Sequence, residues 1–133
     1  MDLLLHLELI RQRQLISNEI IEITLRVQHR LHVHWHADLS TNQINMGLIH
    51  LAMALGRIRR GYCARPLDRD IFEEIKSTLC FGDILAIHQD ILSLIPFDIP
   101  DSEQTHLIAN WYSLALAQPQ ILSPIANKSE EPE

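Results

Sequence analysis

STNQINMGLIHLAMALGRIRRG, residues 40–61, is the stretch that decides the fold, because it has the pattern of one complete amphipathic helix. Ser40 precedes Gln43 by three residues, the spacing of a capping box that bonds free N–H groups in a first turn. An apolar stripe follows at spacings of four and three residues, which is the period of a helix and not of a strand. Three arginines and then Gly61 predict the end of the helix. The stripe consists of Ile44, Leu48, Leu51, Leu55 and Ile58.

A second face of the same helix carries the side chains that bear on function. His50 and Arg57 are seven residues apart, which is two turns, so both point the same way. A single histidine on a helix is more often structural than reactive, so this pattern alone leaves its role open. The face is made up of Met46, His50, Met53, Ala54 and Arg57.

Helical spacing of apolar residues recurs on both sides of this stretch. Ser17 or Asn18 is expected to cap the helix that precedes it. Asp68 or Asp70 is expected to open the helix that follows it. The triplet Phe81-Gly82-Asp83 is expected to be a connector. The predicted helices cover about residues 2–14, 17–35, 68–79, 84–95 and 101–117.

Length and composition indicate a single all-α domain. The 133 residues are enough for one core, and aromatic residues are only 5%, so that core must be largely aliphatic. With four glycines and neither Asn-Gly nor Asp-Gly, the chain lacks the usual turns of β-hairpins. We therefore predict a five-helix bundle (residues 17–117) with a short additional lead-in helix (residues 1–16) and a flexible C-terminal tail (residues 118–133).

Charge and cysteine content limit the classes of partner. The formal net charge of −6 argues against direct binding to nucleic acid, whose footprint is a basic surface. The N-terminal apolar run is too short for a signal sequence or a membrane span. Cys63 and Cys80 form no CxxC pair and are expected to be free thiols in a reducing compartment. We expect a soluble cytoplasmic protein that does not contact a membrane.

Three passages match, in order and spacing, the motifs of one regulatory module. LIHLAMALGRIRRG (residues 48–61) matches the pattern HL..A..R...G, and PLDRDIFEEIKS (residues 66–77) followed by Ala86-Ile87 matches NPL..EIK…A. IPFDIPDSEQTHLIAN (residues 95–110) matches F.I.IP..E..YLALH. Residues 17–116 thus resemble the PTS-regulation domain (PRD), a five-helix module of bacterial antiterminators and transcriptional activators controlled by the sugar phosphotransferase system (PTS).

The resemblance implies a role for the histidine on the central helix. Domains of this family are phosphorylated on histidines by the phosphocarrier HPr or by a sugar-specific EIIB component, which changes domain packing and dimerisation. By resemblance, His50 is the phosphoryl acceptor, HPr or an EIIB component is the phosphodonor, and the domain forms a homodimer. A neutral imidazole nitrogen is a suitable nucleophile. Arg57 is the cation expected to support the phosphoryl group.

The chain departs from the family pattern in two ways. The second family histidine position is occupied by Asn110, which can form hydrogen bonds but cannot accept a phosphoryl group. His106, four residues earlier, can replace it only by facing differently. The flanks of residues 17–117 are too short for an RNA- or DNA-binding domain. We therefore expect a stand-alone single PRD that acts by protein–protein association, for instance with a separate transcription regulator.

Other chemistries find less support in the sequence. His29, His32 and His36 share one helix face at a spacing that can bind Zn²⁺ or Ni²⁺, although a polar helix end is the more common reason for such a pattern. No Ser-His-Asp, GxSxG or phosphate-loop pattern occurs, so we expect no enzyme, no metal site and no cofactor. Two alternatives to the phosphorylated regulator stay open: a phosphorylation-independent scaffold or dimerisation module, and metal binding by the histidine cluster.

Overall fold

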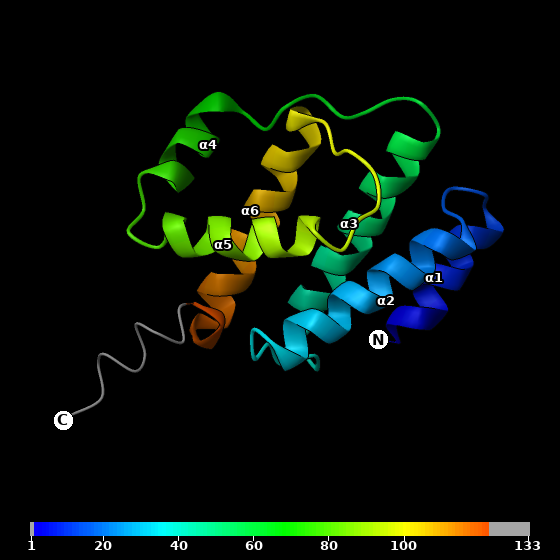
Figure 1. Cartoon of the computed structure of the whole chain (residues 1–133), viewed down its shortest axis with the longest axis horizontal. Coiled ribbons are helices and arrows are strands. Elements are labelled where there is room, and N and C mark those ends of the chain that lie inside the picture. The colour runs from blue at the N-terminus through cyan, green and yellow to red at the C-terminus, as the bar shows by residue number, and fades with distance from the viewer. Residues whose placement is uncertain (1, 123–133) are drawn as a thin grey trace.

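The computed structural model describes residues 2–122, and all of its regular structure is helical (Figure 1). No strand occurs within residues 2–122, which confirms the predicted all-α class. Ser17 and Asp68, two of the four predicted caps, are the N-caps of α2 and α4. The elements are α1 (Leu3–Gln12), α2 (Asn18–Val33), α3 (Asn42–Arg59), α4 (Arg69–Lys76), α5 (Phe81–Leu92), α6 (Asp101–Ala117) and a 3₁₀ helix, η1 (Pro119–Ile121).

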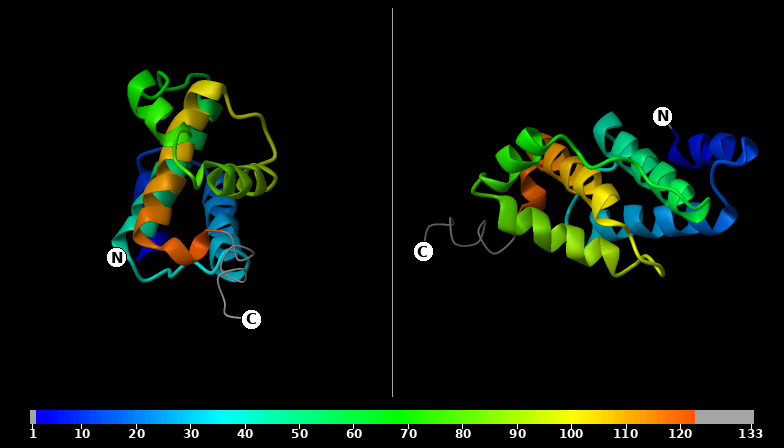
Figure 2. Two further views of the ribbon diagram at one scale, coloured as in Figure 1. Left: turned by 90° about the vertical axis from the view of Figure 1, so that its left-hand side faces the viewer. Right: turned by 90° about the horizontal axis from the view of Figure 1, so that it is seen from above.

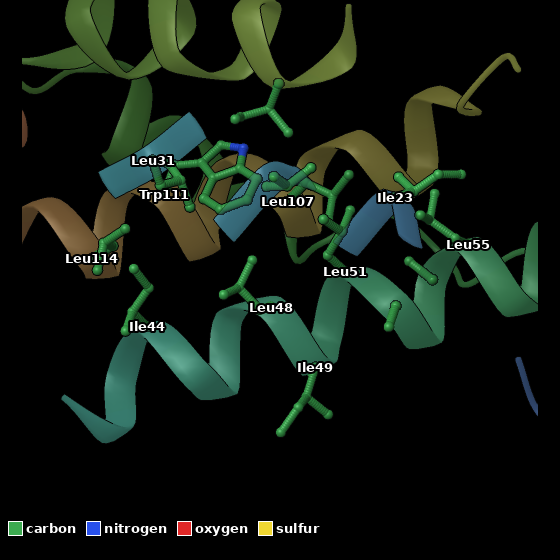
Figure 3. Close-up of a cluster of buried hydrophobic side chains, with 14 of the residues drawn as sticks. Ile23, Leu31, Ile44, Leu48, Ile49, Leu51, Leu55, Leu107, Trp111 and Leu114 are labelled. Carbon is green, nitrogen blue, oxygen red and sulfur yellow. The ribbon is translucent and has the colours of Figure 1, made fainter. Parts of the chain in front are cut away.

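Helix α3 lies at the centre of the bundle, as its apolar stripe predicts. It packs against α1, α2 and α6, and α6 in turn contacts α4 and α5 (Figures 1 and 2). Four stripe residues are at most 2% exposed, and only Ile58 is partly buried. In Figure 3 the stripe points toward α2 and α6, whereas Ile49 points away from this cluster. The labelled partners of the stripe are Ile23, Leu31, Leu107, Trp111 and Leu114.

The first turn of α3 differs from the prediction. Thr41, not Ser40, is the N-cap, and its hydroxyl oxygen accepts a hydrogen bond from the Ile44 N–H at 3.4 Å. The Gln43 amide donates to the carbonyl of Ser113 on α6 at 2.8 Å instead of returning to the cap. The predicted capping box is therefore wrong, because Gln43 joins two helices rather than closing its own first turn.

The last turn of α3 ends as predicted. Gly61 has φ of +92°, a left-handed conformation that residues with a Cβ rarely adopt. Its N–H donates to the Ile58 carbonyl at 3.0 Å, and the Tyr62 N–H donates to the Arg57 carbonyl at 3.1 Å. These two bonds form a Schellman motif, which satisfies carbonyls at the helix end and turns the chain toward α4.

The connection between α4 and α5 corrects two expectations. Helix α4 ends at Lys76, three residues before the predicted end at Leu79, and the Leu79 side chain is fully exposed. Helix α5 begins at Phe81, so Phe81-Gly82-Asp83 is a first turn and not a connector. Cys80 at the N-cap makes no side-chain capping bond. The start of α5 thus lacks the Ser, Thr, Asp or Asn that marks most helix starts.

Both ends of the described chain pack on the bundle. Gln118 accepts from the Asp38 N–H at 2.6 Å and donates to the Asp38 carbonyl at 2.9 Å, and Ile121 in η1 is fully buried. Gln118 and Ile121, which fall in the predicted tail, are thus buried against the bundle, and residues 123–133 of that tail lie outside the described part. None of the described helices is both long and apolar enough to cross a membrane. The buried residues of α1 are Leu3, Leu7 and Ile10.

Candidate functional site

A groove of about 460 Å³ between α3 and α6 collects the side chains that the sequence singles out. His50 is exposed on α3 and faces Asn110 on α6, with 3.5 Å between His50 Nδ1 and Asn110 Oδ1. Two turns along α3, Arg57 meets Glu103 near the start of α6. The later residue of α3 thus pairs with the earlier residue of α6, so the two helices run antiparallel along the groove.

The contact between His50 and Asn110 sets the chemistry of the imidazole. An amide oxygen can only accept a hydrogen bond, so a hydrogen bond across this 3.5 Å contact requires the neutral tautomer that carries its proton on Nδ1. The lone pair of the ring then belongs to Nε2. His50 is exposed, so its ring lies at the protein surface. The two positions that the resemblance assigns to family histidines therefore face each other across the groove.

Arg57 forms a partly buried ion pair that the sequence did not predict. Its Nε and Nη2 atoms each donate to one carboxylate oxygen of Glu103 at 2.9 Å, and Glu103 is 0% exposed. Burial favours the protonated form of Glu103, but hydrogen bonds from Arg57 and from the Ala64 N–H outweigh it and hold its pKa below the ordinary value. Arg57 thus lines the groove, with two of its three guanidinium nitrogens already bound to a carboxylate.

The loop between α3 and α4 is fastened to α6 beside the groove. The Ala64 N–H donates to Glu103 at 2.9 Å, and the Leu67 N–H donates to the Thr105 hydroxyl at 2.9 Å. The Nε2 atom of His106 lies 2.7 Å from the carbonyl oxygen of Arg65. These three bonds connect residues 64–67 to the first turns of α6, so α6 holds both the ion pair and the loop.

The histidine cluster near the end of α2 lies apart from the groove. His29, His32 and His36 are exposed, and His32 Nδ1 bonds to the Ala37 carbonyl at 2.9 Å. Among residues 2–122, no group of three or more His, Cys, Asp or Glu side chains is placed to hold a metal ion. Cys63 and Cys80 are free thiols, as predicted.

Comparison with known proteins identifies relatives over most of the chain. An uncharacterized protein of Haemophilus influenzae is 44% identical over 121 residues, which cover 91% of this chain and 97% of that protein. The chain belongs to the family of this protein. The Escherichia coli protein described as uncharacterized protein YhfY is 28% identical over 111 residues, or 84% of this chain and 92% of YhfY. No family model matches the chain, and no solved structure matches it significantly.

The groove lies within the segment that this family shares. The match to the Haemophilus protein spans 121 of 133 residues, which leaves 12 residues outside it. Whichever end those residues occupy, the matched segment includes everything from His50 to Asn110. The helices that build the groove are therefore part of what relates the chain to its family.

Proposed function

We propose that this protein is a PRD-like regulatory domain that accepts a phosphoryl group on Nε2 of His50 and passes on that state by protein–protein association. Helices α2–α6 would be the five helices of the module, with α1 as an additional N-terminal helix. The phosphodonor would be a phosphohistidine of HPr or of an EIIB component.

The observation that carries the proposal is the meeting of all three motif passages at one groove. His50 and Arg57 come from the first passage, and Leu67 comes from the second. Glu103 and Asn110 come from the third, and they contact Arg57 and His50 respectively. Residues that match a family motif at scattered positions thus build a single concave surface around an exposed histidine.

The transfer requires no group beyond the donor and the imidazole. The Nε2 lone pair of His50 attacks the phosphorus, and the N–P bond of the donor breaks with its electron pair left on the donor imidazole. The donor ring takes up one proton, and the Nδ1 proton of His50 is released to solvent. Asn110 suits both states, because its oxygen accepts from Nδ1–H before transfer and its NH₂ group can donate to bare Nδ1 afterwards.

Phosphorylation of His50 would place a dianion on a surface that is partly apolar, and this change would control which proteins associate with that surface. Met46 is 41% exposed on the same face of α3 as His50, and Met53 lines the groove. Methionine adapts to varied partners, so this face suits a second copy of the chain or a separate transcription regulator. A phosphoryl group at its centre would alter that association by charge and desolvation.

The test is phosphotransfer from labelled phosphoenolpyruvate through enzyme I and HPr, with a purified EIIB component as the second donor. We expect one label per chain in the wild type and in His29→Gln, whose histidine is exposed but lies on α2. His50→Gln should take up none. Equal labelling of His50→Gln would contradict the proposal.

The scaffold alternative has specific observations in its favour. Asn110 cannot accept a phosphoryl group, and Arg57 is already paired with Glu103. A chain that takes no label from either donor, although both donors label a control protein, would be assigned to this alternative. Sedimentation of the unlabelled chain would then test dimerisation directly.

A further inference from the structure

The antiparallel register of α3 and α6 fixes the order of side chains along the groove. His50 lies opposite Asn110, and Arg57 lies opposite Glu103. His106 lines the same groove and lies on α6 between Glu103 and Asn110 in sequence. It therefore occupies the interval between the His50 end and the Arg57 end.

Helix geometry gives the approximate distances along this groove. With a rise of about 1.5 Å per residue, His106 is displaced by roughly 6 Å along α6 from Asn110. Arg57 is displaced by roughly 10 Å along α3 from His50. A phosphoryl group that turns from His50 toward Arg57 therefore reaches the position of His106 first.

The hydrogen bond that His106 makes determines which of its nitrogens is available. A carbonyl oxygen accepts only, so the 2.7 Å contact with Arg65 places a proton on Nε2 and orients the ring. The other nitrogen, Nδ1, is left for a second interaction. When it is protonated, the ring becomes a cation with one donor held by the loop and one donor for an anion.

Arg57 is less suited to this task than its position in the sequence implies. Two of its nitrogens are bound to Glu103, which is fully buried. To bind a phosphoryl group with both of them, Arg57 would have to leave a carboxylate without its partner in the protein interior, which is costly. Protonation of His106, in contrast, breaks no bond that the structure contains.

We propose that His106 is the side chain that holds the phosphoryl group on His50, through Nδ1–H, with its ring oriented by the Arg65 carbonyl. This assignment rests on the proposed function and gives His106 a positioning role, not that of an acceptor. The titratable and charged side chains that line the groove with it are His50 and Arg57 from α3 and Glu103 from α6. Arg65 contributes its carbonyl from the loop.

An NMR measurement that needs no phosphodonor tests the assignment. In His50→Glu, a carboxylate replaces the phosphoryl group, and the ring ¹⁵N resonances of His106 at one fixed pH should move toward those of a ring that donates from both nitrogens. His50→Gln is the neutral control and should leave the His106 resonances unchanged. His29 on α2 is the internal control in all three proteins. A His106 resonance shift in His50→Glu no larger than that of His29 would overturn the assignment.

A second measurement uses the phosphorylated chain. His106→Gln should lower the equilibrium extent of phosphorylation about tenfold, the effect of one charge-assisted hydrogen bond. An unchanged equilibrium, or a phosphoryl group mapped to His106 itself, would overturn the assignment. Absence of phosphorylation at any residue would instead contradict the proposed function, so the two failures are distinguishable.

Discussion

Replacement of Glu103 by glutamine tests the ion pair that closes one end of the groove. Glu103 is 0% exposed and accepts three hydrogen bonds, two from Arg57 and one from the Ala64 N–H. Glutamine has nearly the same shape, but it removes the charge and turns an NH₂ group toward these donors. Breaking a buried pair costs about 3–5 kcal/mol, but Arg57 is 29% exposed and keeps part of its hydration. We therefore expect Glu103→Gln to lower the free energy of unfolding by about 2–3 kcal/mol and Tm by about 6–12 °C.

The chain supplies a matched control for this substitution. Arg59 and Glu19 form an ion pair of the same 2.9 Å length, but their side chains are 47% and 51% exposed. Glu19→Gln should cost less than about 0.5 kcal/mol in urea unfolding measured alongside Glu103→Gln. Because the pKa of Glu103 is lowered, its contribution exists at neutral pH and is lost in acid. The difference in free energy of unfolding between wild type and Glu103→Gln should thus become smaller below about pH 4. Equal losses for the two variants at neutral pH would refute the reasoning.

Two further predictions concern stability. A Cβ at Gly56 would lie 2.2 Å from the Leu15 carbonyl oxygen, whereas one at Gly47 would meet nothing within 4 Å. Gly56→Ala should therefore lower the free energy of unfolding by about 1–3 kcal/mol, and Gly47→Ala should raise it by about 0.5–1 kcal/mol, both measured by thermal unfolding. Similar effects of the two substitutions would contradict this reasoning. His88 is buried between Gln104 and Trp111, and burial lowers its pKa despite the hydrogen bond to Gln104. The unfolded chain thus takes up a proton that folded His88 does not, so stability should fall as pH drops below about 6.5, and urea midpoints of His88→Gln should show a smaller fall.

Features that depend only on neighbouring residues were predicted correctly from the sequence. The apolar stripe of α3 is buried as expected, and Gly61 ends that helix because its left-handed conformation suits a Schellman motif. The start of α5 was missed because Cys80 carries no capping side chain. The cap of α3 was misplaced by one residue, since Ser40 and Thr41 are both suitable and the neighbouring Gln43 is drawn to α6. Such choices depend on tertiary contacts that adjacent residues do not reveal.

The site was predicted only in part for the same reason. The pattern placed His50 and Arg57 on one face, and both line the groove. The partner of Arg57 is 46 residues away in the chain, and no periodicity links the two. Glu103 did stand in a motif passage, as the acidic residue of the IP..E pattern, and that was the one signal for its role. The position of His106 depends on the α3–α6 register, which only the folded chain supplies.

The most direct test of the central claim is to map the phosphoryl group on the chain and to identify the phosphohistidine isomer. The wild-type protein would be phosphorylated by its donor and kept at alkaline pH for peptide mapping and ³¹P NMR. We predict a single phosphoryl group on His50, attached to Nε2, because Asn110 accepts from Nδ1. A phosphoryl group on any other residue, or none at all from a donor that labels a control protein, would contradict the account.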